Sequence, residues 1–406
     1  MRNQRRATLV RDSTLVSQQV VDAPLRRVIF KIHVWVGLAA GLLIVLLGIS
    51  GSALVFRADI ERWLVSDWLT VPIQSERYSL DDAVSRALRD HPERELSKVL
   101  VPAAADESIE VVLQLRNPPT LKAADLISIY VDPYRLEILG ERRRASGVMW
   151  SLQDFHYALF AGELGLKING VAALALLILA LSGPVLWWPG PGRWRYALHI
   201  TRGPRAARWR NLHGLIGIVS WVAIALITLT ALYFAFRGTA TAALTLASGA
   251  ATVVPPAVLQ DAATDPSRSA PLALAPLTTL VRAAREAEPT ARFDELRPAR
   301  TPQRPASLSF RLPGDTVPGR HRMFLDPTTG AVLRVDRFNS LDAGGQLFAN
   351  MAPWHFGSFG GRLSQWLWFV VGLVPAMLLG SGFWLWIRKR RNRIVNTPTP
   401  SSAAHQ

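Results

Sequence analysis

The stretch VWVGLAAGLLIVLLGISGSALVF at residues 34–56 contains no charged side chain, and it decides the fold class. A helix of about 20 apolar residues rises about 1.5 Å per residue and therefore crosses the ~30 Å hydrocarbon layer of a bilayer. Three further stretches of this kind lie at 168–188, 212–236 and 363–387. The sequence therefore predicts a mainly α-helical membrane protein with four transmembrane helices embedded in the lipid bilayer.

The net charge of +16 is confined to three segments beside these stretches. The tail 1–33, the connection 189–211 and the tail 388–406 hold 18 Lys and Arg residues against two Asp residues, and the rest of the chain is neutral. Basic segments next to transmembrane helices stay in the cytoplasm. Both tails and the connection are therefore predicted to be cytoplasmic, and residues 57–167 and 237–362 to face the periplasm. The orientation of the chain in the membrane accounts for these basic segments. They therefore give no reason to expect a nucleic-acid partner.

The chain contains no cysteine. This excludes an iron–sulfur cluster, a thiolate zinc site, disulfide bonds and the covalent attachment of c-type haem. It is also compatible with domains that face an oxidising periplasm.

The sequence repeats itself. The second and fourth stretches align at an offset of 199, which pairs His156 with His355, and the first and third align at an offset of 180, which pairs His33 with His213. Further matches are Phe160 with Phe359, Gly162 with Gly361, Leu164 with Leu363, Ser182 with Ser381, Gly183 with Gly382, Trp187 with Trp386, Gly37 with Gly217, and Phe56 with Phe236. Two halves of equal orientation are expected to be related by a pseudo-two-fold axis along the membrane normal.

The segments between the spans repeat as well. Apolar residues at helical spacing predict a helix in Leu80–Pro92 and another in Leu277–Pro289. Alternating apolar residues on both sides of an Asp-Pro turn predict a β-hairpin around Asp132 and another around Asp326. Each segment is thus predicted to contain a small α+β module.

The predicted organisation is two tandem repeats of span, module and span. The Ala-, Pro- and Thr-rich stretch Gly238–Ala275 is interpreted as a flexible linker and Arg297–Pro305 as a loop within the second module. The boundaries are 1–33 for the cytoplasmic tail, 34–56 for the first span, 57–155 for the first periplasmic module, 156–188 for a periplasmic lead-in and the second span, 189–211 for the cytoplasmic connection, 212–236 for the third span, 237–353 for the linker and the second periplasmic module, 354–387 for a lead-in and the fourth span, and 388–406 for the C-terminal tail.

Four histidines occupy corresponding places in the repeat. His33 and His213 lie at the cytoplasmic starts of the first and third spans, and His156 and His355 lie just before the second and fourth spans on the periplasmic side. A single histidine at the end of a span is usually an interfacial residue. A two-fold axis, however, places His33 opposite His213 and His156 opposite His355 if all four face the bundle interior.

Paired histidines inside a helix bundle are typical axial ligands of b-type haem. The two pairs lie near opposite faces of a ~30 Å layer and cannot share one iron. The pattern therefore predicts two haems b, with all four histidines as ligands of haem iron, and transfer of electrons across the membrane. Zinc or copper is a less favoured alternative, because no carboxylates or thiols accompany the pairs at tetrahedral spacing. The other histidines, His91, His199, His321 and His405, have no repeated partner and are predicted to be surface residues.

With the repeat and the histidines in place, the chain resembles the PepSY-associated transmembrane family over most of residues 25–390. The matching motifs are His33-Val34-Trp35-Val36-Gly37-Leu38, Asp154-Phe155-His156 leading to Gly162, Asn211-Leu212-His213-Gly214 with Gly217, Trp354-His355-Phe356-Gly357 with Gly360-Gly361, and the turns Val131-Asp132-Pro133 and Leu325-Asp326-Pro327, which resemble those of PepSY domains. The resemblance implies a haem-dependent oxidoreductase of the bacterial inner membrane that reduces ferric siderophores in the periplasm during iron uptake.

The electron donor is expected to be a separate partner. The chain ends about 20 residues after its last span and has no Gly-x-Gly-x-x-Gly element that opens a helix. A membrane quinol or a cytoplasmic flavoprotein would then supply the electrons. The acceptor would be a ferric siderophore or another ferric chelate docked under the modules, with Asp154, Glu163, Arg362 and Gln365 as candidates for shaping its site.

Two alternatives belong to other classes of protein. A non-enzymatic membrane protein could use its PepSY-like modules to bind or regulate a partner protein, but it would not need four symmetric histidines. A transporter is expected to show broken spans or charges at mid-membrane. Pro184 and Pro375 hint at such breaks, whereas mid-span charges are missing.

Overall fold

The computed structural model describes residues 23–116, 125–144, 147–200, 203–248, 274–301, 303–317 and 319–395. It divides into two compact units, one formed by residues 1–52, 161–235 and 368–406 and the other by residues 53–160 and 236–367. We call the first the helical unit and the second the sheet unit.

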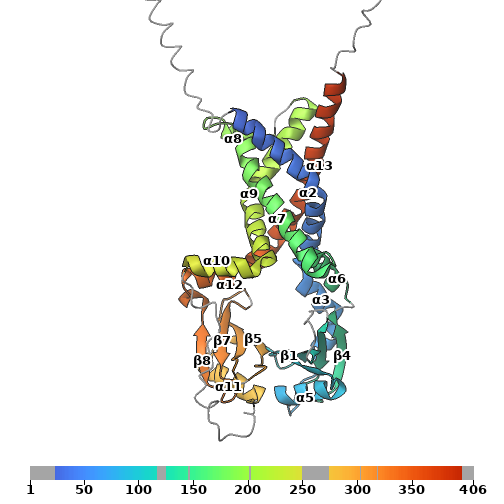
Figure 1. The fold of residues 1–406 in the computed structure, drawn as a ribbon. Helices are drawn as coiled ribbons and strands as arrows, with labels where there is room; N and C mark the ends of the chain where they lie inside the picture. Colours follow the sequence, from blue (N-terminus) through green and yellow to red (C-terminus); the bar gives the residue numbers. More distant parts are fainter. Residues whose placement is uncertain are drawn as a thin grey trace, which may run out of the picture. The chain divides into compact units, whose positions relative to one another are not determined.

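Long apolar helices make up the helical unit, and they confirm the predicted spans (Figure 1). Within the described residues, the four candidate membrane-spanning helices are α2 (Ala23–Leu54), α7 (Gly162–Trp187), α9 (Arg205–Ala235) and α13 (Gly361–Val395), with the short helix α8 (Trp194–Ala197) between α7 and α9. Apolar side chains such as Leu42 and Val222 are 68% and 66% exposed. Such exposure is expected of a surface that faces lipid. Helix α13 continues through the basic segment after residue 387, because Lys and Arg form helices well and favour a helix C-terminus.

Helices α2 and α13 approach each other closely at two glycines. A Cβ atom on Gly48 would overlap the carbonyl oxygen of Gly372, and one on Gly372 would overlap Oγ of Ser52. The Ser52 hydroxyl donates a hydrogen bond of 2.9 Å to the carbonyl of Phe369. Small residues and polar contacts of this kind hold membrane helices together.

We expect Gly372→Leu to destabilise the protein in detergent by about 1–3 kcal/mol, because the added side chain must push α2 away from α13. Thermal unfolding followed by circular dichroism would measure the change. Gly380→Leu is the matched control, since a Cβ at Gly380 on the same helix meets no atom within 4 Å. Equal melting temperatures for the two variants would contradict the close packing of α2 and α13.

The sheet unit contains the same order of elements twice, a helix followed by four strands. The first set is α5 (Leu80–Asp90), β1 (Arg94–Leu100), β2 (Ile109–Leu115), β3 (Ile127–Val131) and β4 (Ile138–Arg143), and the second is α11 (Leu277–Ala287), β5 (Arg292–Arg297), β6 (Ala306–Arg311), β7 (His321–Leu325) and β8 (Val332–Asp336). The flanking helices are α3 (Arg57–Leu64), α4 (Ser66–Leu69), α6 (Val148–Ala158), α10 (Arg237–Ser248), the 3₁₀ turn η5 (Phe338–Ser340) and α12 (Ala343–Phe356). The predicted helices and hairpins are thus confirmed.

Local sequence explains where these elements begin and turn. Ser79 and Asp82 form a capping box at the start of α5. The carboxylate of Asp132 accepts the backbone N–H of Tyr134 at 2.7 Å, and that of Asp326 accepts the N–H of Thr328 at 2.8 Å. An Asp side chain that bonds its own backbone two residues later stabilises a tight turn.

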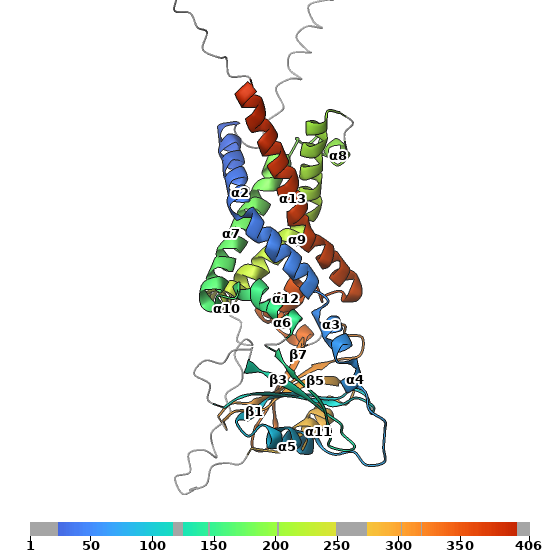
Figure 2. The same cartoon turned by 90° about the vertical axis from the view of Figure 1, so that its right-hand side faces the viewer.

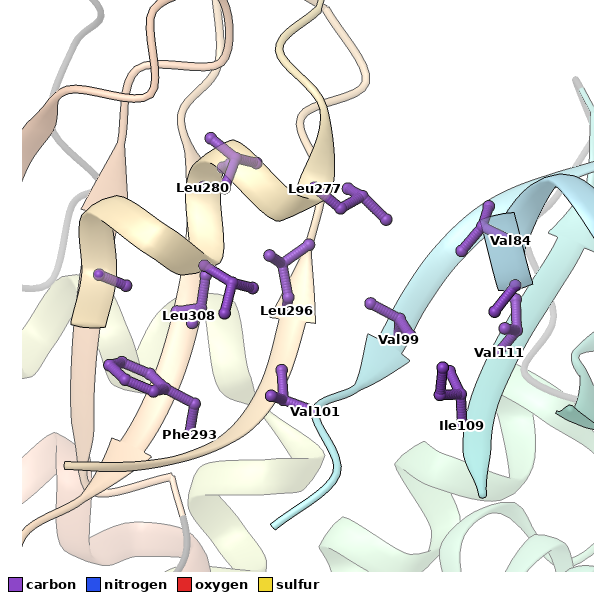
Figure 3. Close-up of a cluster of buried hydrophobic side chains, with 14 of the residues drawn as sticks. Val84, Val99, Val101, Ile109, Val111, Leu277, Leu280, Phe293, Leu296 and Leu308 are labelled. Carbon is purple, nitrogen blue, oxygen red and sulfur yellow. The ribbon is translucent and has the colours of Figure 1, made fainter. Parts of the chain in front are cut away.

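The two sets of strands join into one sheet, which the sequence did not predict. All neighbouring strands are antiparallel, and the eight described strands have the order β4-β3-β2-β1-β5-β6-β7-β8. Strands β1 and β5 form the junction, where Val99 lies opposite Leu296. Helices α5 and α11 also meet, because Asp81 of α5 accepts the backbone N–H of Leu277, at the start of α11, at 2.7 Å. One continuous apolar core lies between these helices and the sheet (Figure 3).

The linker prediction needs a correction. Residues 237–248 form helix α10, and residues 249–273 lie outside the described residues. Alanine has the highest helix propensity, and the start of this stretch is rich in alanine. The composition of residues 237–248 therefore favours a helix over a flexible chain. The predicted loop between 297 and 305 does lie between β5 and β6.

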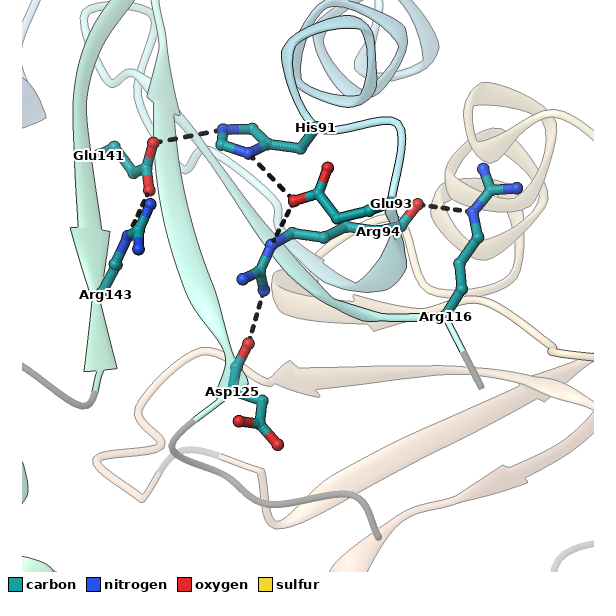
Figure 4. Close-up of polar contacts among 7 residues, drawn as sticks. All are labelled: His91, Glu93, Arg94, Arg116, Asp125, Glu141 and Arg143. Atoms are coloured by element: carbon teal, nitrogen blue, oxygen red, sulfur yellow. Dashed lines mark hydrogen bonds and ion pairs between the residues drawn. The ribbon is translucent and has the colours of Figure 1, made fainter. Parts of the chain in front are cut away.

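Two histidines predicted to lie on the surface have structural contacts. His321 is 3% exposed, accepts the backbone N–H of Phe338 through Nδ1 at 3.2 Å and contacts Asp315 through Nε2 at 2.7 Å, so its surface assignment is wrong. His91 lies 3.2 Å from Glu141 at the edge of the sheet (Figure 4). Of the other two, His199 is exposed, and His405 lies outside the described residues.

Candidate functional site

The structure brings His33 of α2 and His213 of α9 together inside the helical unit. Their ring centres are 6.3 Å apart, and their ring planes meet at 82°. We call these two residues the inner pair.

The second pair lies in the sheet unit. His156 of α6 and His355 of α12 also have ring centres 6.3 Å apart, with an angle of 50° between their planes. We call these two residues the outer pair. Both histidines lie near the C-terminal ends of their helices, which are followed by Leu159 and Gly357 in left-handed backbone conformations.

The chain accepts backbone strain three residues after His156, where α6 has ended. Leu159 has φ 50° and Phe160 has φ 59°, which is the left-handed region that side chains with a Cβ rarely adopt. Each such residue costs about 1–2 kcal/mol, and strain of this kind gathers at functional sites. The strained residues directly follow α6, the helix that carries His156.

The separation within each pair fits two ligands of one metal. An imidazole bound through nitrogen has its ring centre about 3.1 Å from the metal, since the metal–nitrogen bond is about 2.0 Å and the nitrogen lies about 1.1 Å from the centre. Two imidazoles on opposite sides of one iron therefore have centres about 6.2 Å apart. The observed 6.3 Å agrees with this value in both pairs.

The donor set also fits haem. Among the described residues, no group of three or more His, Asp or Glu side chains gathers as a metal site. A structural zinc ion needs four protein ligands, whereas haem iron needs two because the macrocycle supplies the other four. Two histidines in each pair thus match the number of axial ligands in a b-type haem.

A serine fixes each histidine of the inner pair. The Nδ1 atom of His33 lies 2.7 Å from Oγ of Ser182, and the Ser182 hydroxyl donates to the carbonyl of Ile178 at 2.7 Å. A hydroxyl has a single hydrogen, so Oγ accepts the hydrogen bond from Nδ1–H of His33. Nε2 is then the free, unprotonated nitrogen that can bind iron.

His213 repeats this arrangement. Its Nδ1 atom lies 2.9 Å from Oγ of Ser381, whose hydroxyl donates to the carbonyl of Met377 at 2.7 Å. A second residue that accepts the remaining ring N–H orients a metal-binding histidine and raises its basicity. The sequence aligned Ser182 with Ser381 and indicated them only as small residues that leave room for a flat macrocycle. Their hydrogen bonds to the histidines were not predicted, because these contacts depend on how the helices pack.

The inner pair lines a cavity of about 2330 Å³ in the helical unit. Pockets for small ligands usually enclose about 300–1,000 Å³, so this space is ample for a large planar group. Gly183 lines the cavity, and a Cβ there would meet no atom within 4 Å, whereas one on Gly382 would lie 3.3 Å from Cε1 of His213. A side chain at either glycine would therefore occupy space beside the inner pair.

The four polar residues predicted to shape the outer site lie elsewhere or have other partners. Arg362 forms an ion pair with Asp59, and its hydrogen bond to Asp59 lowers the pKa of that carboxyl group. Arg362 also lies 3.3 Å from the side-chain oxygen of Gln365 and donates a hydrogen bond to it. Glu163 pairs with Lys167 on the surface of α7 at 2.8 Å. Asp154 is two residues before His156 on α6, which places it on a different side of that helix.

Four long apolar helices define a multi-pass membrane protein. The family model of the PepSY-associated TM region matches residues 30–389, so the chain belongs to this family. A comparison with curated proteins finds no match.

Proposed function

We propose that the protein is a di-haem b electron-transfer protein of the bacterial inner membrane that reduces a ferric siderophore in the periplasm. The two histidine pairs carry this proposal. Each has the 6.3 Å separation expected for the axial ligands of one haem. Family membership and the basic cytoplasmic segments support the membrane and its orientation.

We also propose that the chain arose by duplication of one unit. The order of elements in the sheet unit occurs twice, and each histidine pair joins one residue from each half. The inner pair would lie near the cytoplasmic face and the outer pair near the periplasmic face, with the sheet unit in the periplasm. Such an arrangement provides two relay points across the bilayer.

Each residue then has a defined task. His33 and His213 hold one haem, and His156 and His355 hold the other. When bound, haem b supplies one-electron redox chemistry. Ser182 and Ser381 keep Nε2 of the inner histidines free of protons.

A quinol or a cytoplasmic flavoprotein would supply the electrons, and one electron converts each ferric ion into a ferrous ion. Hard oxygen chelators hold ferrous iron less well than ferric iron, so reduction releases the metal. If the protein were instead a non-enzymatic membrane protein that binds a partner, the inner and outer histidine pairs would have no function.

The optical spectrum of the full chain, purified from haem-replete cells, tests the proposal. We expect a Soret band, split α-bands after reduction and two haems b per chain in the pyridine haemochrome assay. The dithionite-reduced protein should then be reoxidised by a ferric siderophore under anaerobic conditions. A colourless preparation would refute the haem proposal, and a haem protein that no ferric chelate reoxidises would refute the acceptor.

A further inference from the structure

The cavity of the inner pair has a basic end and an apolar end. Along α2 its lining residues run from Arg26 past His33 to the buried Ile44. Along α9 they run in the same order, from Arg210 past the inner histidine to the buried Ile224. In two perpendicular views the start of α2 and the end of α13 lie at the same end of the helical unit as α8, the short helix before α9 (Figures 1 and 2). The inner histidines therefore lie between a basic and an apolar part of one cavity.

The basic end contains no carboxylate of the protein among the described residues. Arg388 of α13 also lines the cavity, and none of the described lining residues is Asp or Glu. Within the described parts of the helical unit, the one acidic side chain is that of Glu163. It pairs with Lys167 in the first turns of α7, whereas α7 lines the cavity only from Leu176 onwards. An anion in the cavity would therefore meet positive charge without competition from these acids.

Arg26 and Arg210 lie on the same faces of their helices as the inner histidines. Arg26 precedes His33 by seven residues, about two turns, and Arg210 precedes His213 by three. Residues at these spacings share one side of a helix. The guanidinium of Arg26 is held in place, because it donates a hydrogen bond of 2.7 Å to the carbonyl of Leu186 near the end of α7. A guanidinium has five N–H donors, so Arg26 can bind an anion at the same time.

We infer that Arg26 and Arg210 bind the two propionate carboxylates of the haem held by the inner pair. The inference rests on the proposed function and adds the residues that recognise the charged edge of the cofactor. The rest of the haem edge is apolar, and an unpaired carboxylate among apolar helices is costly. A guanidinium can donate two parallel hydrogen bonds to one carboxylate, so the basic end of the cavity favours the propionates and the apolar end favours the opposite edge.

Basic residues at this end also have a simpler explanation, which a neighbouring arginine can test. Lys and Arg beside membrane helices are held in the cytoplasm whatever they bind. Arg208 belongs to the same basic segment of α9 and lies two residues before Arg210, but it is not among the residues that line the cavity. If only the charge of the membrane surface mattered, Arg208 and Arg210 would have equal effects. Recognition of a carboxylate in the cavity requires an effect of Arg210 alone.

Titration of the full chain with two porphyrins tests the inference. The chain carries His355→Ala, which removes a ligand of the outer pair, and is purified without haem in detergent; we call this protein the parent. Haem and haem dimethyl ester, which keeps the iron and the macrocycle but has no free carboxylate, are each added while the Soret band is followed. We expect Arg26→Gln and Arg210→Gln each to weaken haem binding about ten-fold and to leave ester binding unchanged. Comparing one porphyrin between variants cancels its partitioning into detergent.

Two matched variants and a redox titration complete the test. Arg208→Gln should bind both porphyrins like the parent, and Arg210→Lys keeps the charge and should retain most of the haem affinity. Unchanged ester binding by Arg26→Gln would show that the helices still pack when the hydrogen bond to Leu186 is lost. Removing a positive charge beside the haem favours the ferric form, so the midpoint potential of the inner haem should fall in both Arg26→Gln and Arg210→Gln.

The outcomes separate this inference from the proposed function. Weaker binding of haem but not of its ester in Arg26→Gln and Arg210→Gln, with Arg208→Gln unaffected, would support the propionate site. Parent-like haem binding by both of these variants, equal losses of haem and ester affinity, or equal effects of Arg208→Gln and Arg210→Gln would overturn it while the inner haem remained. A parent protein that bound neither porphyrin would refute haem at the inner pair, and the propionate site with it.

Discussion

His213→Ala is expected to remove one of the two haems and to abolish the reduction of a ferric chelate by quinol or flavoprotein. The variant leaves His33 as the single imidazole of the inner pair, and an iron held from one side binds far more weakly. Haem content in the pyridine haemochrome assay should fall from two per chain to about one. The remaining haem should show unaltered optical bands, because the outer pair lies in the other compact unit.

The complementary variant His355→Ala should also lose one haem, but a different one. The two singly substituted proteins are expected to differ in the positions of their reduced α-bands, because the rings meet at 82° in the inner pair and at 50° in the outer pair. His199→Ala is the control, since His199 is exposed and its side chain bonds the backbone carbonyl of Arg195 on its own turn of the chain. Full haem content in both His213→Ala and His355→Ala would refute the assignment of the two pairs.

Much of the architecture follows from local signals in the sequence. The four spans follow from uninterrupted apolar stretches, and the hairpins from the Asp-Pro turns at Asp132 and Asp326. These signals act within a few residues of the chain, and so they can be recognised without knowing the fold. The approach of His33 to His213 is a long-range contact. It was predictable because the internal repeat implies a two-fold relation between the halves, and this relation places the two histidines opposite each other.

Other contacts gave no such signal. The pairing of β1 with β5 joins segments nearly 200 residues apart, and no turn between them fixes their register. The cap that Asp81 provides to Leu277 also depends on this junction. His321 has no counterpart in the repeat, so the sequence could not indicate that Asp315 and Phe338 enclose it.

Helix α10 shows the opposite error, a local signal that was misread. The stretch after Gly238 was interpreted as a linker from its overall Ala, Pro and Thr content. Its prolines lie after residue 253, whereas the segment up to Ser248 contains alanine and leucine and forms a helix. Composition averaged over a long window hid a boundary between two kinds of sequence.

Ser182→Ala and Ser381→Ala are expected to weaken haem binding at the inner pair by about 10- to 100-fold, the usual cost of removing a residue that orients a metal ligand. Each substitution deletes the acceptor of an Nδ1–H hydrogen bond, at 2.7 Å for His33 and at 2.9 Å for His213. The imidazole then donates less electron density to ferric iron, so the midpoint potential of the inner haem should rise. Redox titration of the α-band measures this shift apart from any change in activity.

Two further variants separate orientation of the histidines from general packing. Ser182→Thr keeps the hydroxyl and should restore both haem affinity and potential. Ser220→Ala removes a serine of α9 that also donates to a carbonyl one turn earlier, that of Ile216 at 2.7 Å, but has no hydrogen bond to a histidine among the described contacts. It should leave the potential unchanged. If Ser182→Ala and Ser381→Ala also left the potential of the inner haem unchanged, the serines would serve only to pack the helices, and Nε2 would have to be kept free of protons in another way.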